Sequence, residues 1–150
     1  MEIRIQSDSF DSGQEANAFA DGLKNSGAVV TFSGVVRNNA AGDLVAMEIE
    51  TYPAMAKTAI GSIVEEARAR WGFEDVLVIH RHGSLKAGET IMMVATASAH
   101  RVAAFEAAEF LMDYLKSRAP FWKKEVTKSG ETWVEAQEHD EAALGRWSDG

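Results

Sequence analysis

Two periodicities of hydrophobic and polar positions run along this chain, one typical of strands and one typical of helices. Alternating apolar and polar residues, or runs rich in β-branched residues, predict strands. The strands expected on this basis are residues 2–6, 28–36, 44–51, 76–79 and 91–97. Residues 123–128 and 132–136 flank a turn at Ser129 and Gly130, which predicts a closing hairpin.

Apolar residues spaced three or four positions apart predict three helices. The first covers residues 13–25, and the third covers residues 99–118, with Ser98 as its N-cap and Pro120 beyond its end. The second begins at Pro53, because proline suits the first turn of a helix. We expect its core-facing side to consist of residues that recur every four positions: Met55, Ala59, Ile63, Ala67 and Trp71.

Composition limits the class of protein. The chain has 150 residues, of which 46 % are hydrophobic, and a formal net charge of -8. These values predict one globular domain over residues 1–150, with a polar tail at about 138–150 that is mobile or docks on a partner. The sequence lacks a signal peptide pattern and a long apolar run, so we expect a cytoplasmic protein without a membrane partner. It has no cysteine, which excludes disulfides, cysteine nucleophiles and thiolate metal sites.

Positive charge is concentrated between residues 113 and 128. This segment places four cations around an aromatic pair: Lys116, Arg118, Lys123 and Lys124 around Phe121 and Trp122. Because Asp and Glu outnumber Lys and Arg by 23 to 15, the cluster favours a small anion over a nucleic acid. Two alternatives stay open at this point, a solvated helix end and a small patch that touches RNA.

Two further groups of basic residues are candidates for anion binding. His100 and Arg101 lie in the first turn of the third predicted helix, where free backbone N–H groups favour an anion. A capping or packing role for His100 fits the same position. Arg37 opens the polar loop that follows a glycine-interrupted strand. His80 and His82 share one face of a strand, but no carboxylate has ligand spacing, so we favour packing roles and predict no metal site.

Lysines beside apolar side chains suit proton transfer, because an apolar neighbourhood disfavours the charged ammonium. Lys116 and Lys123 have Met112, Phe121 and Trp122 nearby in the sequence. Either lysine is therefore a candidate general acid or base.

Several motifs together resemble a known family. The runs GAVVTFSGVVRN (27–38), EARARWG (66–72), VIHRHGSLKAGE (78–89), SAHRVAAFEAAEFLMDYLKSRAPFWKKE (98–125) and WVEA (133–136) closely resemble the large, catalytic subunit of molybdopterin synthase. The resemblance covers nearly the whole chain. It implies an α+β fold of the α/β-hammerhead type with an additional antiparallel β subdomain, which the periodicities alone do not distinguish from a ferredoxin-like sandwich.

The resemblance also implies a reaction. Members of this family convert cyclic pyranopterin monophosphate (precursor Z) to molybdopterin by adding two sulfurs. The sulfurs come from the thiocarboxylated C-terminal glycine of a small, ubiquitin-like partner subunit. A chain without cysteine fits this scheme, because it must receive its sulfur from elsewhere. No cofactor and no nucleic acid partner are expected.

Family substrate contacts can be carried over to matching positions of this chain. They fall on Val35, Val36, Arg37, His100, Arg101, Lys116, Lys123, Lys124 and Glu125. The lysines implied to be catalytic are Lys116 and Lys123. The chain departs from some family members at Gln137, where they carry an arginine, so anion binding by that position is in doubt.

Helix geometry adds a hypothesis about assembly. Arg101 and Lys116 are fifteen residues apart on one predicted helix, which separates them by about 22 Å. We therefore expect a homodimer in which His100 and Arg101 of one protomer complete the lysine site of the other. The family implies such a dimer with a small subunit at each end, a heterotetramer. The alternative function is a non-catalytic module that binds a pterin, a nucleotide or RNA in the same basic pocket.

Overall fold

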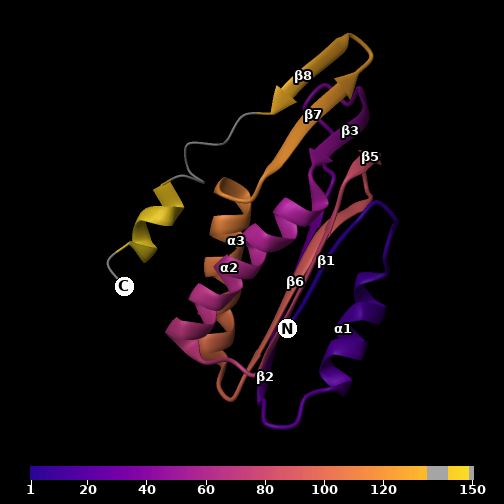
Figure 1. Cartoon of the computed structure of the whole chain (residues 1–150). Helices are drawn as coiled ribbons and strands as arrows, with labels where there is room; N and C mark the ends of the chain where they lie inside the picture. Colours follow the sequence, from indigo (N-terminus) through magenta and orange to yellow (C-terminus); the bar gives the residue numbers. More distant parts are fainter. Residues whose placement is uncertain (135–141, 149–150) are drawn as a thin grey trace.

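The computed structural model describes residues 1–134 and 142–148 and contains two four-stranded sheets (Figure 1). The strands of the first sheet, in spatial order, are β1 (Glu2–Gln6), β4 (Asp75–Arg81), β6 (Thr90–Ser98) and β2 (Ala28–Val35). The strands of the second, in spatial order, are β5 (Gly83–Leu85), β3 (Leu44–Thr51), β7 (Phe121–Thr127) and β8 (Gly130–Val134). The pair β1–β4 is parallel and every other described pair is antiparallel.

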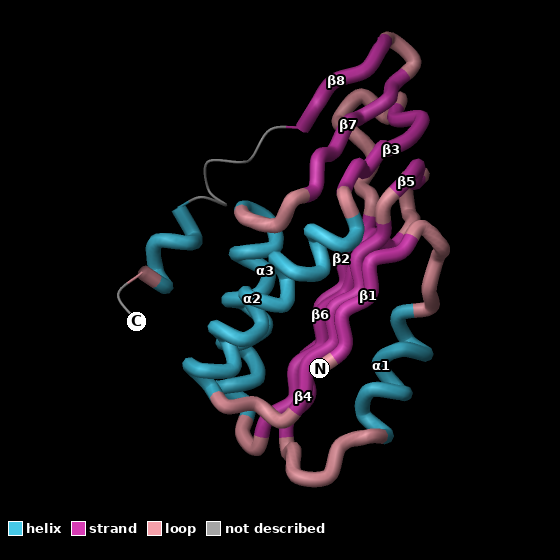
Figure 2. Tube along the Cα trace, viewed as in Figure 1, coloured by secondary structure: helices cyan, strands magenta, loops and turns pink. Residues whose placement is uncertain are grey.

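Helices cover both faces of the first sheet (Figure 2). On one face lie α2 (Pro53–Trp71) and α3 (Arg101–Ser117), and on the other lies α1 (Ser12–Asp21). Because successive residues of a strand point to opposite faces, Val76 and Val78 of β4 join the core beneath α2 and α3. Leu77 and Ile79 belong to the smaller core beneath α1. The even-numbered positions of β4 therefore face the side that α3 covers.

The second sheet extends beyond one end of the first (Figure 1). The chain passes from β4 almost directly into β5, and Gly83 has a φ of 99° there, a conformation that favours glycine. The chain also passes between the sheets where β3 ends at Thr51 and where Pro120 precedes β7. There the Thr51 hydroxyl donates a hydrogen bond of 2.8 Å to the Pro120 carbonyl. The α+β class with an additional antiparallel sheet is thereby confirmed.

The face of α2 that packs on the core differs from the prediction. The buried residues are Ala56, Ile60, Ile63, Val64 and Ala67. Met55, in contrast, is 47 % exposed. The reason is that an α-helix turns every 3.6 residues, so a strict four-residue repeat drifts by about 40° per step around the axis. Of the predicted stripe, Ile63 and Ala67 are buried and Trp71 packs against the core, so the prediction fails at the start of the helix.

The start of α3 also differs from the prediction. Ser98 is not the N-cap, because β6 continues through Ser98, which pairs with Ala28 and is buried. The N-cap is His100, whose side chain makes no capping hydrogen bond. Two other elements also differ from the predicted bounds, since α1 ends at Asp21 and β7 begins at Phe121.

The described part of the C-terminal tail packs on its own chain. The Trp147 ring lies edge-on to Trp71 and Phe110, with centroids 5.4 Å away in each case. Its indole N–H donates a hydrogen bond of 2.6 Å to Asp113, and Leu144 is buried. The predicted end of the last strand and Gln137 lie outside the described residues. None of the described helices is both long enough and apolar enough to cross a bilayer.

Candidate active site

A cavity of about 100 Å³ lies where α3, β7 and the edge of the first sheet meet. Its wall is formed by Phe32, Gly34, Val35, His80, Ile91, Met92, Met112, Leu115, Lys116 and Lys123. The two lysines come from different elements, since Lys116 lies in the last turn of α3 and Lys123 lies on β7. Most of the other wall residues are apolar, so the cavity presents two amino groups in a largely apolar setting.

Local structure explains how the two lysines meet. Lys116 is an exposed cation at the C-terminal end of α3, where the helix dipole favours positive charge. Pro120 follows the end of α3, and β7 then runs antiparallel to β3 with Lys123 opposite Ile49. Since Ile49 is 2 % exposed, that register turns Lys123 toward the interior side of the second sheet.

Besides α3 and β7, the end of β2 forms part of the cavity wall, and its pairing is irregular there. The pairing of β2 with β6 shifts register between Gly34 and Val35. A Cβ on Gly34 would lie 3.3 Å from the Cγ of Met92, so glycine leaves room there for the Met92 side chain. Val35 is 51 % exposed and lines the cavity, whereas the Val36 side chain is buried in the core. Of the two valines that the sequence predicts as contacts, only Val35 offers its side chain.

Lys124 and Glu125 do not line this cavity. Neighbouring residues of a strand point to opposite faces, so Lys124 faces away from Lys123. There it forms an ion pair of 3.3 Å with Glu131 and lies 5.2 Å from the centre of the Trp133 ring. Glu125 is half-buried opposite Met47 of β3.

His100 and Arg101 lie at the far end of the same helix as Lys116. Both are exposed, and α3 is continuous from Arg101 to Ser117. At a rise of about 1.5 Å per residue, Arg101 is about 22 Å from Lys116 along the helix. Arg37, just after β2, is exposed and does not line the cavity. One protomer therefore gathers Val35, Lys116 and Lys123 but leaves His100 and Arg101 at a distance.

His80 is a cavity residue to which sequence reasoning gave only a packing role. It is 4 % exposed, and its ring is stacked on that of Phe121 with centroids 3.7 Å apart. Burial lowers the pKa of His80 to about 3, and the nearby charge of Lys123 acts in the same direction. The sequence feature that indicates the orientation of His80 is its even-numbered position on β4, which puts it on the same face of the strand as Val78.

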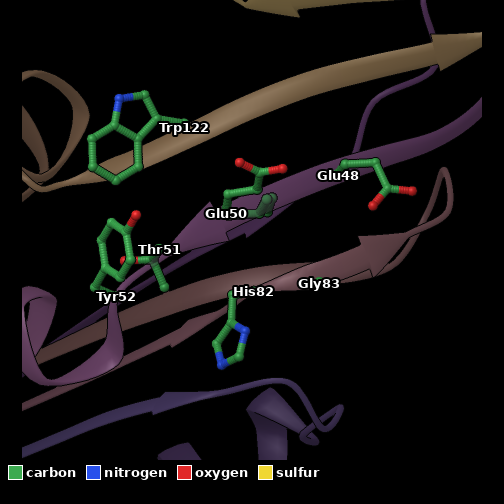
Figure 3. Close-up of a pocket in the computed structure, with 8 residues that line it drawn as sticks. Glu48, Glu50, Thr51, Tyr52, His82, Gly83 and Trp122 are labelled. Atoms are coloured by element: carbon green, nitrogen blue, oxygen red, sulfur yellow. The ribbon is translucent and has the colours of Figure 1, made fainter.

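A larger hollow of about 520 Å³ opens on the other side of the second sheet (Figure 3). Its lining residues are Glu48, Ile49, Glu50, Thr51, Tyr52, His82, Gly83 and Trp122. Tyr52 and Trp122 meet edge to face, with ring centroids 6.2 Å apart. The lining includes two carboxylates and neither lysine nor arginine, so it is unsuited to an anion. The smaller cavity, with its two lysines, is the better candidate. The described residues contain no group of three His, Asp or Glu side chains placed to hold a metal ion.

Comparisons with known proteins agree with one another. The family model described as "MoaE protein" matches residues 5–118. The molybdopterin synthase catalytic subunit of Cereibacter sphaeroides is 63 % identical over 98 % of this chain and 100 % of its own length. The subunit of the same name from Escherichia coli is 56 % identical over 81 % of each chain.

Solved structures are also similar. The molybdopterin biosynthesis MoaE protein from Burkholderia ambifaria superposes with a TM-score of 0.82 at 47 % identity, covering 99 % of both chains. The crystal structure of molybdopterin synthase from Staphylococcus aureus gives a TM-score of 0.79 at 28 % identity, over 88 % of this chain and 96 % of that one.

Proposed function

This chain belongs to the MoaE family and has the activity of a molybdopterin synthase catalytic subunit, an enzyme that transfers sulfur; we propose that the transfer takes place in the cavity between Lys116 and Lys123. The observation that carries the proposal is the convergence of two lysines from separate elements on one largely apolar cavity. Amino groups in such a setting stabilise developing negative charge more strongly than they do in water.

The substrate in this proposal is cyclic pyranopterin monophosphate, which receives two sulfurs. Each sulfur arrives as the thiocarboxylate at the C-terminal glycine of a small ubiquitin-like partner. The thiocarboxylate sulfur forms a bond to a side-chain carbon of the pterin as a carbon–oxygen bond at that carbon breaks, and the displaced oxygen leaves as water or stays on the phosphate. Water then cleaves the acyl–sulfur bond, which leaves the sulfur on the pterin as a thiolate and releases the partner with a C-terminal carboxylate. Lys116 and Lys123 stabilise the oxyanion of that cleavage and move the protons that it releases.

The size of the cavity argues for an extended tail at this place. Binding sites that enclose a whole small molecule have volumes of about 300–1,000 Å³. A cavity of about 100 Å³ is smaller than that, so it does not enclose the whole pterin, and in this proposal it receives the end of the partner's tail at the reacting atoms. The rest of the pterin and its phosphate must then be held by groups outside this cavity.

We propose that a second protomer supplies those groups, with its His100 and Arg101 binding the phosphate and pterin beside Arg37. The surface near these residues supports a homodimer, since Val102 and Phe105 of α3 are each 60 % exposed. Phe32 of the edge strand β2 is also 42 % exposed and lines the lysine cavity. An interface that buries these apolar side chains joins the two parts of the site. With a small subunit bound at each lysine cavity, the assembly is a heterotetramer in the cytoplasm.

Mixed dimers test this arrangement. Lys116→Ala and Arg101→Ala are each expected to be inactive as homodimers. After subunit exchange, half of the dimers contain one of each chain and one intact site, so about a quarter of wild-type turnover should return. Exchange is verified by native mass spectrometry. An inactive mixture in which the exchanged dimer is detected contradicts the shared site.

The rival function, a binding module without turnover, has less support. A relative that had lost catalysis would be expected to have lost Lys116 or Lys123, and both are present. The rival function predicts pterin or RNA binding that is unaccompanied by conversion, and RNA binding weakens steeply with salt.

A further inference from the structure

The second sheet has a face that points away from the lysine cavity, which we call the outer face. Because Lys123 lines the cavity, its neighbours on β7, Trp122 and Lys124, project from the outer face. Trp133 of β8 pairs with Lys124 and lies on the same face. Trp122, Trp133 and Tyr52 are exposed, and such rings are enriched at protein interfaces. The outer face is therefore a candidate contact surface.

One ring of the outer face already holds a cation from its own chain. The Lys124 ammonium lies 5.2 Å from the centre of the Trp133 ring and 3.3 Å from a carboxylate oxygen of Glu131. The electron-rich face of the ring attracts the cation, and the carboxylate adds an ion pair. The outer face thus contains one complete group of ring, carboxylate and cation.

A second group on the same face has rings and a carboxylate of its own. Glu50 of β3 lies directly opposite Trp122 in the antiparallel register, so their Cβ atoms are about 5 Å apart. Tyr52, two residues beyond Glu50 in extended conformation, meets the Trp122 ring edge to face. Within the described residues, no ion pair or hydrogen bond reaches the Glu50 carboxylate. Lys124, the next side chain of β7 on this face, pairs with Glu131 instead.

The second group lines the hollow of about 520 Å³, which is large enough for a long side chain. The planes of Tyr52 and Trp122 are 80° apart, so the two rings form a corner, and Figure 3 shows both on the same side of Glu50. Glu48 adds a second carboxylate to the lining, and His82 is not hydrogen-bonded to either carboxylate within the described residues. Ring faces and carboxylates together suit a cation.

We propose that the hollow is a docking site for an arginine side chain of a protein partner. A guanidinium is planar, so it stacks on an aromatic ring while it donates two parallel hydrogen bonds to a carboxylate, which a lysine ammonium cannot do. The formal net charge of -8 favours a partner that is basic at the contact over a second copy of this chain. The hollow and the lysine cavity share no lining residue, so the inference is independent of the proposed sulfur transfer.

A titration of the full chain with a capped Gly-Arg-Gly peptide tests this site. Binding is followed in ¹⁵N NMR by the indole N–H signal of Trp122, assigned with Trp122→Phe, and by the backbone N–H signal of Gly83, which also lines the hollow. The same peptide with citrulline in place of arginine has nearly the same shape without the charge. Free arginine is the alternative source of the same guanidinium.

We expect the arginine peptide to shift both signals and the citrulline peptide to bind at least about 10-fold more weakly. Glu50→Gln should weaken binding of the arginine peptide by about 10-fold or more, and Trp122→Leu by about 3- to 30-fold. The matched controls are Glu131→Gln and Trp133→Leu, which alter the group that already holds Lys124. They should leave the affinity within about twofold of the wild type.

Three results overturn the proposal. The first is equal binding of the arginine and citrulline peptides, or no shift of either signal. The second is an affinity in folded Glu50→Gln that matches the wild type; this exposed position keeps the test valid if Trp122→Leu fails to fold. The third is tighter binding of free arginine than of the capped peptide, which means that the hollow takes a small molecule and not a side chain of a partner.

Discussion

Buried, neutral His80 should make the protein less stable in mild acid, and His80→Phe should remove part of that effect. The pKa of His80 is lowered to about 3 in the folded chain, against 6.5 when exposed. The unfolded chain therefore binds one more proton than the folded chain between these values. Proton uptake by the imidazole of the unfolded chain favours unfolding as the pH falls. The stabilising contribution of neutral His80 is therefore fully present above about pH 6.5 and is lost as pH falls.

The size of the effect follows from the same two values. From pH 7 to pH 5, proton uptake by the unfolded imidazole lowers the free energy of unfolding by about 2 kcal/mol, at 1.36 kcal/mol per pH unit. In His80→Phe that contribution is absent. The carboxyls whose pKa is lowered by folding, Glu15, Glu74, Asp75 and Glu89, are present in both proteins and cancel in the comparison.

Urea unfolding followed by tryptophan fluorescence measures this difference, since Trp71 and Trp147 pack on the core. Curves at pH 7, 6 and 5 are recorded for the wild type and for His80→Phe. The wild type should lose about 2 kcal/mol more than the variant between pH 7 and pH 5. Parallel losses in the two proteins refute the reasoning, because they mean that His80 takes up its proton in the folded state as well.

Three other substitutions test separate parts of the structure. Lys116→Ala should abolish pterin conversion while changing the free energy of unfolding by less than about 0.5 kcal/mol, because the side chain is exposed; a large loss of stability contradicts a catalytic role. Trp147→Ala should lower the free energy of unfolding by about 2–3 kcal/mol in urea titrations, since it loses two edge-on ring contacts and a hydrogen bond. Trp133→Ala, at a 51 % exposed position, is its control and should change little; equal losses remove the support for tail docking. Gly27→Ala should lower the melting temperature, with a loss of about 1–3 kcal/mol, because its Cβ would lie 2.7 Å from the Ala99 carbonyl oxygen; wild-type stability means that the backbone there gives way easily.

Periodicity predicted the order of the elements, apart from the short strand β5, and predicted their ends poorly. Strand alternation and helical spacing report which residues share a face, and this information is local. The end of β6 depends instead on a neighbour: Ser98 stays in the strand because Ala28 pairs with it and the Gly27 N–H donates to its carbonyl. Such a partner, seventy residues away in the sequence, leaves no mark on the local pattern around Ser98.

The candidate site shows the same limit. Lys116 and Lys123 were found because they lie close together in the sequence within one basic cluster. The cluster itself divides in space, since Phe121 turns inward to His80 while Trp122 turns outward to the acidic hollow. His80 was assigned to packing because its contact with Phe121 joins two sheets, which local spacing does not reveal. The separation of Arg101 from Lys116 was predictable, because it follows from the length of one continuous helix.

The most direct test of the proposed function is conversion of the pterin itself. The purified chain is mixed with its thiocarboxylated small partner and cyclic pyranopterin monophosphate, and the pterin is followed by mass spectrometry. The account predicts a product that carries two added sulfurs and that is absent with Lys116→Ala. An unchanged pterin, with folded protein and measured partner binding, contradicts sulfur transfer at this cavity.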